Sequence, residues 1–85
     1  MSIIRINYYD GYDLNSVEIY EIEEDILNEL NYFIENGKCI SNIYEQLIKY
    51  NQYSENREYM CVKYIENNCK KIKFDKTNIF QLNLK

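Results

Sequence analysis

The residues of this chain that are best suited to chemistry are carboxylates, and they gather in its first half. Between Asp10 and Glu35 there are nine acidic residues and no basic one. Paired carboxylates perform acid–base chemistry when burial raises the pKa of one of them. Most of these acids lie in stretches expected to face water, which disfavours a catalytic pair. Asp10, Asp13 and Asn15 also lack the ordered ligands of a calcium loop and are typical of a turn.

Other common catalytic groups are absent or badly placed. The chain has no His to act as a general base near neutral pH. Its two glycines, Gly11 and Gly37, are isolated and cannot form a phosphate-binding loop. We therefore expect a protein that is not an enzyme, with no catalytic residues, no cofactor and no metal.

The three cysteines are an odd number and include no Cys-x-x-Cys motif. A disulfide framework needs an even set in an oxidising compartment, so Cys39, Cys61 and Cys69 are expected to be reduced, small apolar fillers in a cytoplasmic protein. A redox role stays the alternative. It would need an electropositive, partly exposed position, which Lys70 and Lys71 offer only to Cys69.

Charge is divided unevenly along the chain, whose formal net charge is −4. Residues 1–36 hold nine acids and one base, and residues 37–85 hold nine bases and five acids. The dipole of a helix that starts near residue 24 explains three of the acids, Glu23, Glu24 and Asp25. The other six leave a field of one sign, which attracts a partner of opposite charge.

Tyrosine is the second signal of a binding surface, with ten in 85 residues. Tyrosine is enriched at interface hot spots, although A/T-rich codon usage and strand propensity explain its frequency equally well. We expect the acids to replace phosphates against Arg and Lys of a partner. The predicted partner-binding residues are Asp10, Tyr12, Asp13, Glu18, Tyr20, Glu21, Glu23, Glu24 and Asp25.

The basic half of the chain supplies a weaker alternative, nucleic-acid binding by a lysine cluster. Lysines interleaved with an aromatic residue can bind single strands. The overall negative charge opposes this function, and lysines on an edge strand also prevent aggregation. Direct nucleic-acid binding is therefore disfavoured. The cluster comprises Lys70, Lys71, Lys73 and Lys76 around Phe74.

The elements that must position these residues form a single domain over residues 1–85. Hydrophobic periodicity predicts an N-terminal hairpin with a long loop, two helices, a segment that could be helix or strand, and a C-terminal hairpin. For the ambiguous segment, 54–68, helix is favoured, with Ser54 as its N-cap. The predicted strands are 3–9, 16–22, 71–75 and 78–84, and the predicted helices are 24–36 and 42–51.

This order of elements predicts an α+β fold. A small antiparallel sheet, made of the N-terminal and C-terminal hairpins, would carry two or three helices on one face. The apolar residues of the helices recur at helical spacing and mark the side that faces the sheet. Their positions are Ile26, Leu27, Leu30, Phe33 and Ile34 in the first helix, and Ile43, Tyr44, Leu47 and Ile48 in the second.

In size, acidity and lack of catalytic groups, the chain resembles small inhibitors encoded by phages and mobile elements, such as anti-CRISPR proteins. The resemblance implies a protein that docks its acidic N-terminal face on a basic, nucleic-acid-binding surface of a host protein. The alternative is a self-associating module or complex subunit, for example a homodimer, joined by Tyr-rich or strand-edge surfaces. No signal peptide or membrane span is expected, and the composition indicates a low-GC genome.

Overall fold

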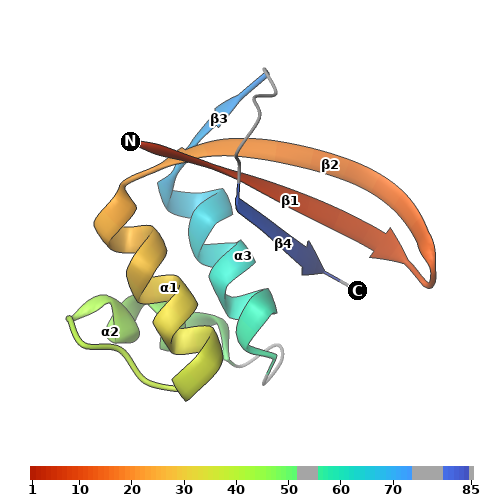
Figure 1. The fold of residues 1–85 in the computed structure, drawn as a ribbon. Helices are drawn as coiled ribbons and strands as arrows, with labels where there is room; N and C mark the ends of the chain where they lie inside the picture. Colours follow the sequence, from red (N-terminus) through yellow and green to blue (C-terminus); the bar gives the residue numbers. More distant parts are fainter. Residues whose placement is uncertain (52–55, 74–79, 85) are drawn as a thin grey trace.

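One mixed sheet and three α-helices packed on one of its faces make up the part of the chain that the structure describes (Figure 1). The structure is a computed structural model and describes residues 1–51, 56–73 and 80–84. The predicted α+β class is confirmed. The strands are β1 (Ser2–Asp10), β2 (Asp13–Ile22), β3 (Lys70–Ile72) and β4 (Phe80–Leu84); the helices are α1 (Glu24–Asn36), α2 (Ile43–Leu47), the 3₁₀ turn η1 (Ile48–Tyr50) and α3 (Arg57–Asn68).

The order of strands across the sheet is β3-β2-β1-β4, so the predicted C-terminal hairpin is wrong. β3 pairs antiparallel with β2, whereas β4 pairs parallel with β1 on the other edge. In β4, Leu82 lies opposite Ile6. Pairing with β1 therefore extends the apolar face that β1 turns toward the helices. The turn predicted at 75–78 lies outside the described residues.

The N-terminal hairpin is longer than predicted, and its loop is shorter. β2 begins at Asp13, which pairs with Asp10, so only Gly11 and Tyr12 form the turn. A two-residue hairpin turn of this kind needs a positive φ, and the φ angle of Gly11 is 65°. Backbone pairing continues through the polar tip because the ladder requires only N–H and C=O groups. Apolar alternation reveals the buried part of a strand and not its whole length.

α1 matches the prediction, and both of its ends have a physical cause. Glu24 and Asp25 lie in its first turn, where the helix dipole favours anions. At its end, Gly37 adopts the left-handed conformation with φ 75°, and its N–H donates to the carbonyl of Phe33. Arg57 Nη1 donates to the carbonyl oxygen of Ile34 at 3.0 Å. This cation satisfies one of the carbonyls that the helix leaves free.

The two glycines allow a matched stability test. Both have positive φ, so an Ala at either position is strained by about 1 kcal/mol. A Cβ on Gly11 would meet nothing within 4 Å, but a Cβ on Gly37 would lie 2.6 Å from Nη2 of Arg57. We expect Gly11→Ala to destabilise the fold by about 1 kcal/mol and Gly37→Ala by about 1.5 kcal/mol in urea unfolding. Equal losses would contradict the close approach of Arg57.

Most of the ambiguous segment is helical, because α3 spans Arg57–Asn68. Its N-cap is Asn56, whose Oδ1 accepts a hydrogen bond from Tyr59 N–H, so the prediction of Ser54 as N-cap is wrong. Asn and Ser cap equally well, and sequence alone could not choose between them. Ser54 itself lies outside the described residues.

The second predicted helix is shorter than expected, and the side chain of Asn42 does not cap it. α2 spans Ile43–Leu47 and continues as η1. Asn42 makes no side-chain cap bond, since its backbone is already helical at φ −72° and ψ −1°. Instead, Ser41 Oγ accepts a weak bond from the N–H of Ile43 at 3.4 Å. In this helix Ile43 and Leu47 are buried, while Tyr44 and Ile48 are exposed.

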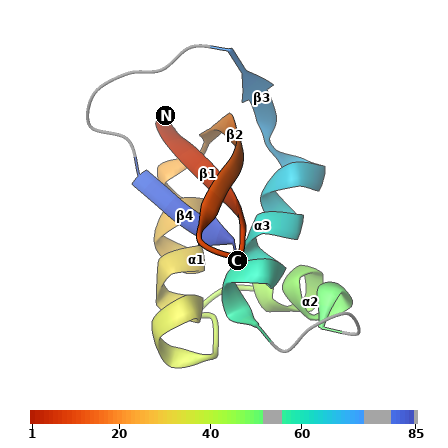
Figure 2. The same cartoon turned by 90° about the vertical axis from the view of Figure 1, so that its right-hand side faces the viewer.

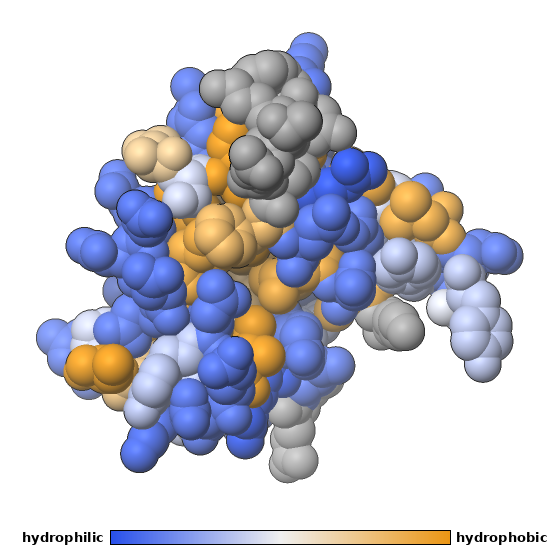
Figure 3. All heavy atoms as spheres, viewed as in Figure 1, coloured by the Kyte–Doolittle hydropathy of each residue, from blue (hydrophilic) through white to orange (hydrophobic). Residues whose placement is uncertain are grey.

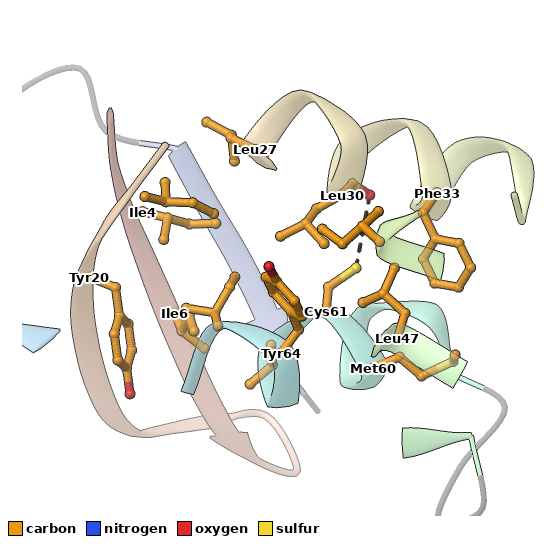
Figure 4. Packing of buried hydrophobic residues seen from close by; sticks show 14 residues of the cluster. Ile4, Ile6, Tyr20, Leu27, Leu30, Phe33, Leu47, Met60, Cys61 and Tyr64 are labelled. Carbon is orange, nitrogen blue, oxygen red and sulfur yellow. Dashed lines mark hydrogen bonds between the residues drawn. The ribbon is translucent and has the colours of Figure 1, made fainter. Parts of the chain in front are cut away.

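The core lies between the sheet and the helices (Figures 2 and 4). From Ile4 to Tyr8 in β1 and from Glu18 to Ile22 in β2, the even-numbered residues point toward the helices, because alternate side chains of a strand face opposite sides. Figure 4 shows Ile4 and Ile6 facing residues of α1 and α3. The buried apolar residues are Ile4, Ile6, Tyr20, Ile22, Leu27, Leu30, Phe33, Ile43, Leu47, Met60, Cys61, Val62, Tyr64 and Ile65.

Candidate partner-binding surface

The tip of the β1–β2 hairpin extends past the helices and carries three of the predicted partner-binding residues (Figure 1). Asp10 and Asp13 are paired across the turn, and Tyr12 between them is 101% exposed. Every residue from 10 to 16 is exposed. The tip therefore presents to solvent a phenol ring flanked by two carboxylates. We call Asp10, Tyr12 and Asp13 the tip group.

A second set of predicted residues lies where β2 passes into α1. Glu23, Glu24 and Asp25 are all exposed there, and we call them the base group. Glu21 lies close by in β2, but it is half-buried and opposite Lys70 of β3. Lys70 therefore offsets part of its charge.

The tip group and the base group are far apart. β2 has ten residues and connects them, and a strand rises about 3.3 Å per residue. The separation is therefore about 30 Å. The single acidic surface expected from the sequence is divided into two acidic groups at opposite ends of the hairpin.

Glu18 and Tyr20 were also predicted to bind a partner, but their side chains make hydrogen bonds within the fold. Both are even-numbered residues of β2 and face the helices. Tyr20 is 4% exposed, and its hydroxyl donates to Glu18 Oε2 at 2.5 Å. Glu18 Oε1 also accepts a hydrogen bond from Lys71 Nζ at 3.2 Å. Tyr20 therefore belongs to the core and not to an exposed docking surface.

A polar network extends from Glu18 to α3 through Tyr8. The Tyr8 hydroxyl lies 2.5 Å from Glu66 Oε2 and 3.2 Å from Glu18 Oε2. A phenol has one proton to donate, and the shorter distance assigns it to Glu66. The other oxygen of Glu66 pairs with Lys63 Nζ at 3.2 Å. Sequence reasoning missed this network because Tyr8 and Glu66 are 58 positions apart.

The pKa values of the network show what it can do chemically. Burial, and then the neighbouring carboxylates, raise the pKa of Tyr8 and of Tyr20 well above the ordinary value. The Tyr20 hydrogen bond, with help from Lys71 and Tyr8, lowers the pKa of Glu18. At neutral pH the phenols are thus protonated and Glu18 is ionised. These groups stabilise the fold and are not suited to exchanging protons near pH 7.

The three thiols are shifted away from reactivity. Burial raises the pKa of the Cys61 thiol to about 12. Burial also raises the pKa of Cys39 and of Cys69, and for Cys69 it is the sole cause. Because the thiolate is the reactive form, adjacent lysines do not make Cys69 a nucleophile at neutral pH. The structure thus favours the interpretation of the cysteines as fillers.

The lysine cluster is partly offset by acids. Lys71 pairs with Glu18, and Lys70 lies opposite Glu21, although both lysines are exposed. Lys73 is exposed as well, while Lys76 and Phe74 lie outside the described residues. Over the described residues, no helix is both long and apolar enough to cross a membrane.

A groove beside α1 was not predicted from the sequence. It has a volume of about 560 Å³ and lies between α1 and the segment that follows it. The only signal in the sequence was Ile40, an apolar residue between two helices. That residue is 78% exposed. The groove is lined by Asp25, Ile26, Asn28, Glu29, Tyr32, Ile40 and Ser41.

The groove adjoins the base group, since Asp25 belongs to both. The candidate surface therefore has three parts, namely the tip group, the base group and the groove. Comparison of the chain with models of known protein families, with curated proteins and with solved structures finds no match.

Proposed function

We propose that this chain is a non-enzymatic inhibitor that binds a protein, encoded by a phage or another mobile element and similar in role to anti-CRISPR proteins. It acts in the host cytoplasm without a cofactor and covers a basic, nucleic-acid-binding surface of its partner. One observation carries the proposal: Tyr12 is fully exposed between Asp10 and Asp13 at the end of a projecting hairpin.

The tip group is distinguished by having no evident task inside the fold. Tyr8 and Tyr20 each donate a hydrogen bond to a carboxylate and pack against the core. Within the described residues, Tyr12 has no such partner, and its ring is surrounded by solvent. A tyrosine beside carboxylates suits a basic partner, because its ring stacks on Arg while the acids pair with the guanidinium.

The distance between the two acidic groups supports a nucleic-acid-binding partner. Double-stranded DNA rises 3.4 Å per base pair, so about 30 Å corresponds to roughly nine base pairs. The tip and base groups together could occupy two phosphate-binding positions along one basic channel. Neither group has a basic residue within it that would neutralise its field.

Self-association is a second candidate, favoured by β4. This strand forms one edge of the described sheet, and its sequence, Phe-Gln-Leu-Asn-Leu, contains no charge. Charged residues usually protect edge strands, as Lys70 and Lys71 do on β3. Phe80 is also exposed. Sedimentation over a range of concentrations tests this candidate, and a strict monomer removes the homodimer.

The proposed function is tested with purified CRISPR effector–guide complexes from low-GC bacteria. We expect stoichiometric inhibition of target-DNA cleavage that weakens steeply as salt is raised. Asp10→Asn/Asp13→Asn should weaken inhibition by roughly 10²- to 10⁴-fold, because each of the two lost charge-assisted bonds is worth about 1.5–3 kcal/mol. The readouts are cleavage on gels and binding by calorimetry.

The matched control is Glu35→Gln/Glu45→Gln, which neutralises two exposed acids away from the hairpin. Each pair changes the net charge from −4 to −4 + 2 = −2. The control should inhibit like the unaltered chain. Equal weakening by both pairs would mean that total charge, and not the tip, is responsible. A lack of inhibition of every complex would overturn the proposed function.

A further inference from the structure

A hydrogen bond ties the segment that follows α1 to that helix, beside the groove. After α1 the chain reverses at Gly37 and returns along the helix, where the Ile40 N–H donates to Glu29 Oε2 at 3.1 Å. This bond fixes the returning segment beside α1, and the Ile40 side chain remains 78% exposed. Figure 3 shows a small apolar patch at the lower left of a largely hydrophilic face.

The lining of the groove combines an apolar part with an acidic part. Ile26, Tyr32 and Ile40 contribute the apolar surface. Asp25 and Glu29 contribute carboxylates, and they lie four positions apart on one side of α1. No lysine or arginine is among the described residues that line the groove, and α1 itself contains none. The carboxylates therefore have no counter-charge in the groove.

We propose that this groove binds an apolar segment of the partner that carries a Lys or Arg side chain. The aliphatic stem of such a side chain would pack on Ile26 and Ile40 while its charged end reaches Asp25 and Glu29. The inference rests on the proposed function and adds the chemistry of the recognised segment. Charge complementarity selects this occupant, since an acidic or purely polar segment would lose either the carboxylate contacts or the apolar ones.

The groove is tested directly with a short synthetic peptide of alternating Lys and Leu, titrated into the isotope-labelled chain and followed by NMR. We expect saturable amide shifts at Asp25, Glu29 and Ile40. Lys–Ser and Glu–Leu peptides of equal length should bind at least about tenfold more weakly, which is a difference in binding free energy of about 1.4 kcal/mol. Equal binding of the Lys–Ser peptide would show bulk charge attraction and overturn the proposal.

Two variants test the apolar part and the charged part of the groove separately. Ile40→Ser removes apolar surface, and Ile48→Ser is its control, because Ile48 is exposed but outside the groove. Asp25→Asn/Glu29→Gln removes the charge, while the Gln oxygen can still accept the Ile40 N–H. Each groove variant should raise the Kd of the Lys–Leu peptide about tenfold. The control Ile48→Ser should leave that Kd unchanged.

The charge control is Glu35→Gln/Glu45→Gln, at exposed positions outside the groove. If it weakens the peptide as much as the groove pair does, the proposal is wrong. Self-association of the chain that Ile40→Ser abolishes would assign the groove to a second copy and also overturn it. The tip variant Asp10→Asn/Asp13→Asn separates the two proposals, because it should spoil inhibition of the effector and leave peptide binding intact.

Discussion

Leu30→Ala will destabilise the protein by about 3–4 kcal/mol, the cost of removing a large buried side chain from a packed core. Leu30 is 1% exposed and lies in the middle of α1, facing residues of α3 (Figure 4). Ala is the best helix former, so the helix itself loses nothing by the change. The loss therefore measures packing alone.

This loss is a large fraction of the total free energy of unfolding. A domain of 85 residues has a total stability of about 4–13 kcal/mol. In the part of the chain that the structure describes, the helices cover one face of a single sheet, and no second layer there can compensate for a cavity. The measurement is urea unfolding followed by circular dichroism, with Asn31→Ala as the control at the adjacent, exposed position. The control should shift stability by less than about 0.5 kcal/mol. A loss below about 1 kcal/mol for Leu30→Ala would contradict the core described above.

Helices and strands were predictable where the spacing of the apolar side chains agreed with the residues typical of the ends of the element. In α1, apolar residues at helical spacing, acids in the first turn and Gly37 all indicate the same helix. The strand partner of β4 was not predictable in this way. Alternation at Leu82 and Leu84 indicates a strand but contains no information about its neighbour. That neighbour is decided by which free edge continues the buried face, and here it is β1.

The candidate surface was predictable in composition but not in shape. Closeness in sequence placed Asp13 and Glu23 in one patch, but an extended strand separates them. Tyr20 is buried because it lies on the face of β2 that meets the helices. The sequence alone did not indicate which of the two faces of that strand is buried. The groove is lined by Glu29 and Ile40, which are joined by a hydrogen bond to the Ile40 backbone that no periodicity reveals.

The network around Tyr8 should make stability depend on pH in both directions. The folded pKa of Glu18 is lowered, chiefly by the Tyr20 hydrogen bond, so its contribution is present above the ordinary Glu pKa of about 4.3. That contribution is lost as the pH falls further. The folded pKa values of Tyr8 and Tyr20 are raised, so their contribution is present below about pH 10 and lost as the pH rises beyond it. Stability is therefore expected to be highest between these limits.

Tyr8→Phe should destabilise the fold at pH 7 by about 2–3 kcal/mol, because hydrogen bonds to charged acceptors contribute about 1.5–3 kcal/mol. The change removes the donor to Glu66 and keeps the ring that packs against the core. It should also reduce the loss of stability above pH 10, while Glu18→Gln should reduce the loss at acid pH.

Tyr12→Phe is the matched control, since its fully exposed hydroxyl has no partner among the described residues. Urea unfolding from about pH 3 to 11 gives both limbs of the profile and the size of each loss. If Tyr8→Phe and Tyr12→Phe give the same profile, the Tyr8–Glu66 bond does not stabilise the fold. If Tyr12→Phe also leaves effector inhibition unchanged, the tip uses the phenol ring and not its hydroxyl. The two tyrosines thus separate the part of the hairpin that stabilises the fold from the part proposed to bind a partner.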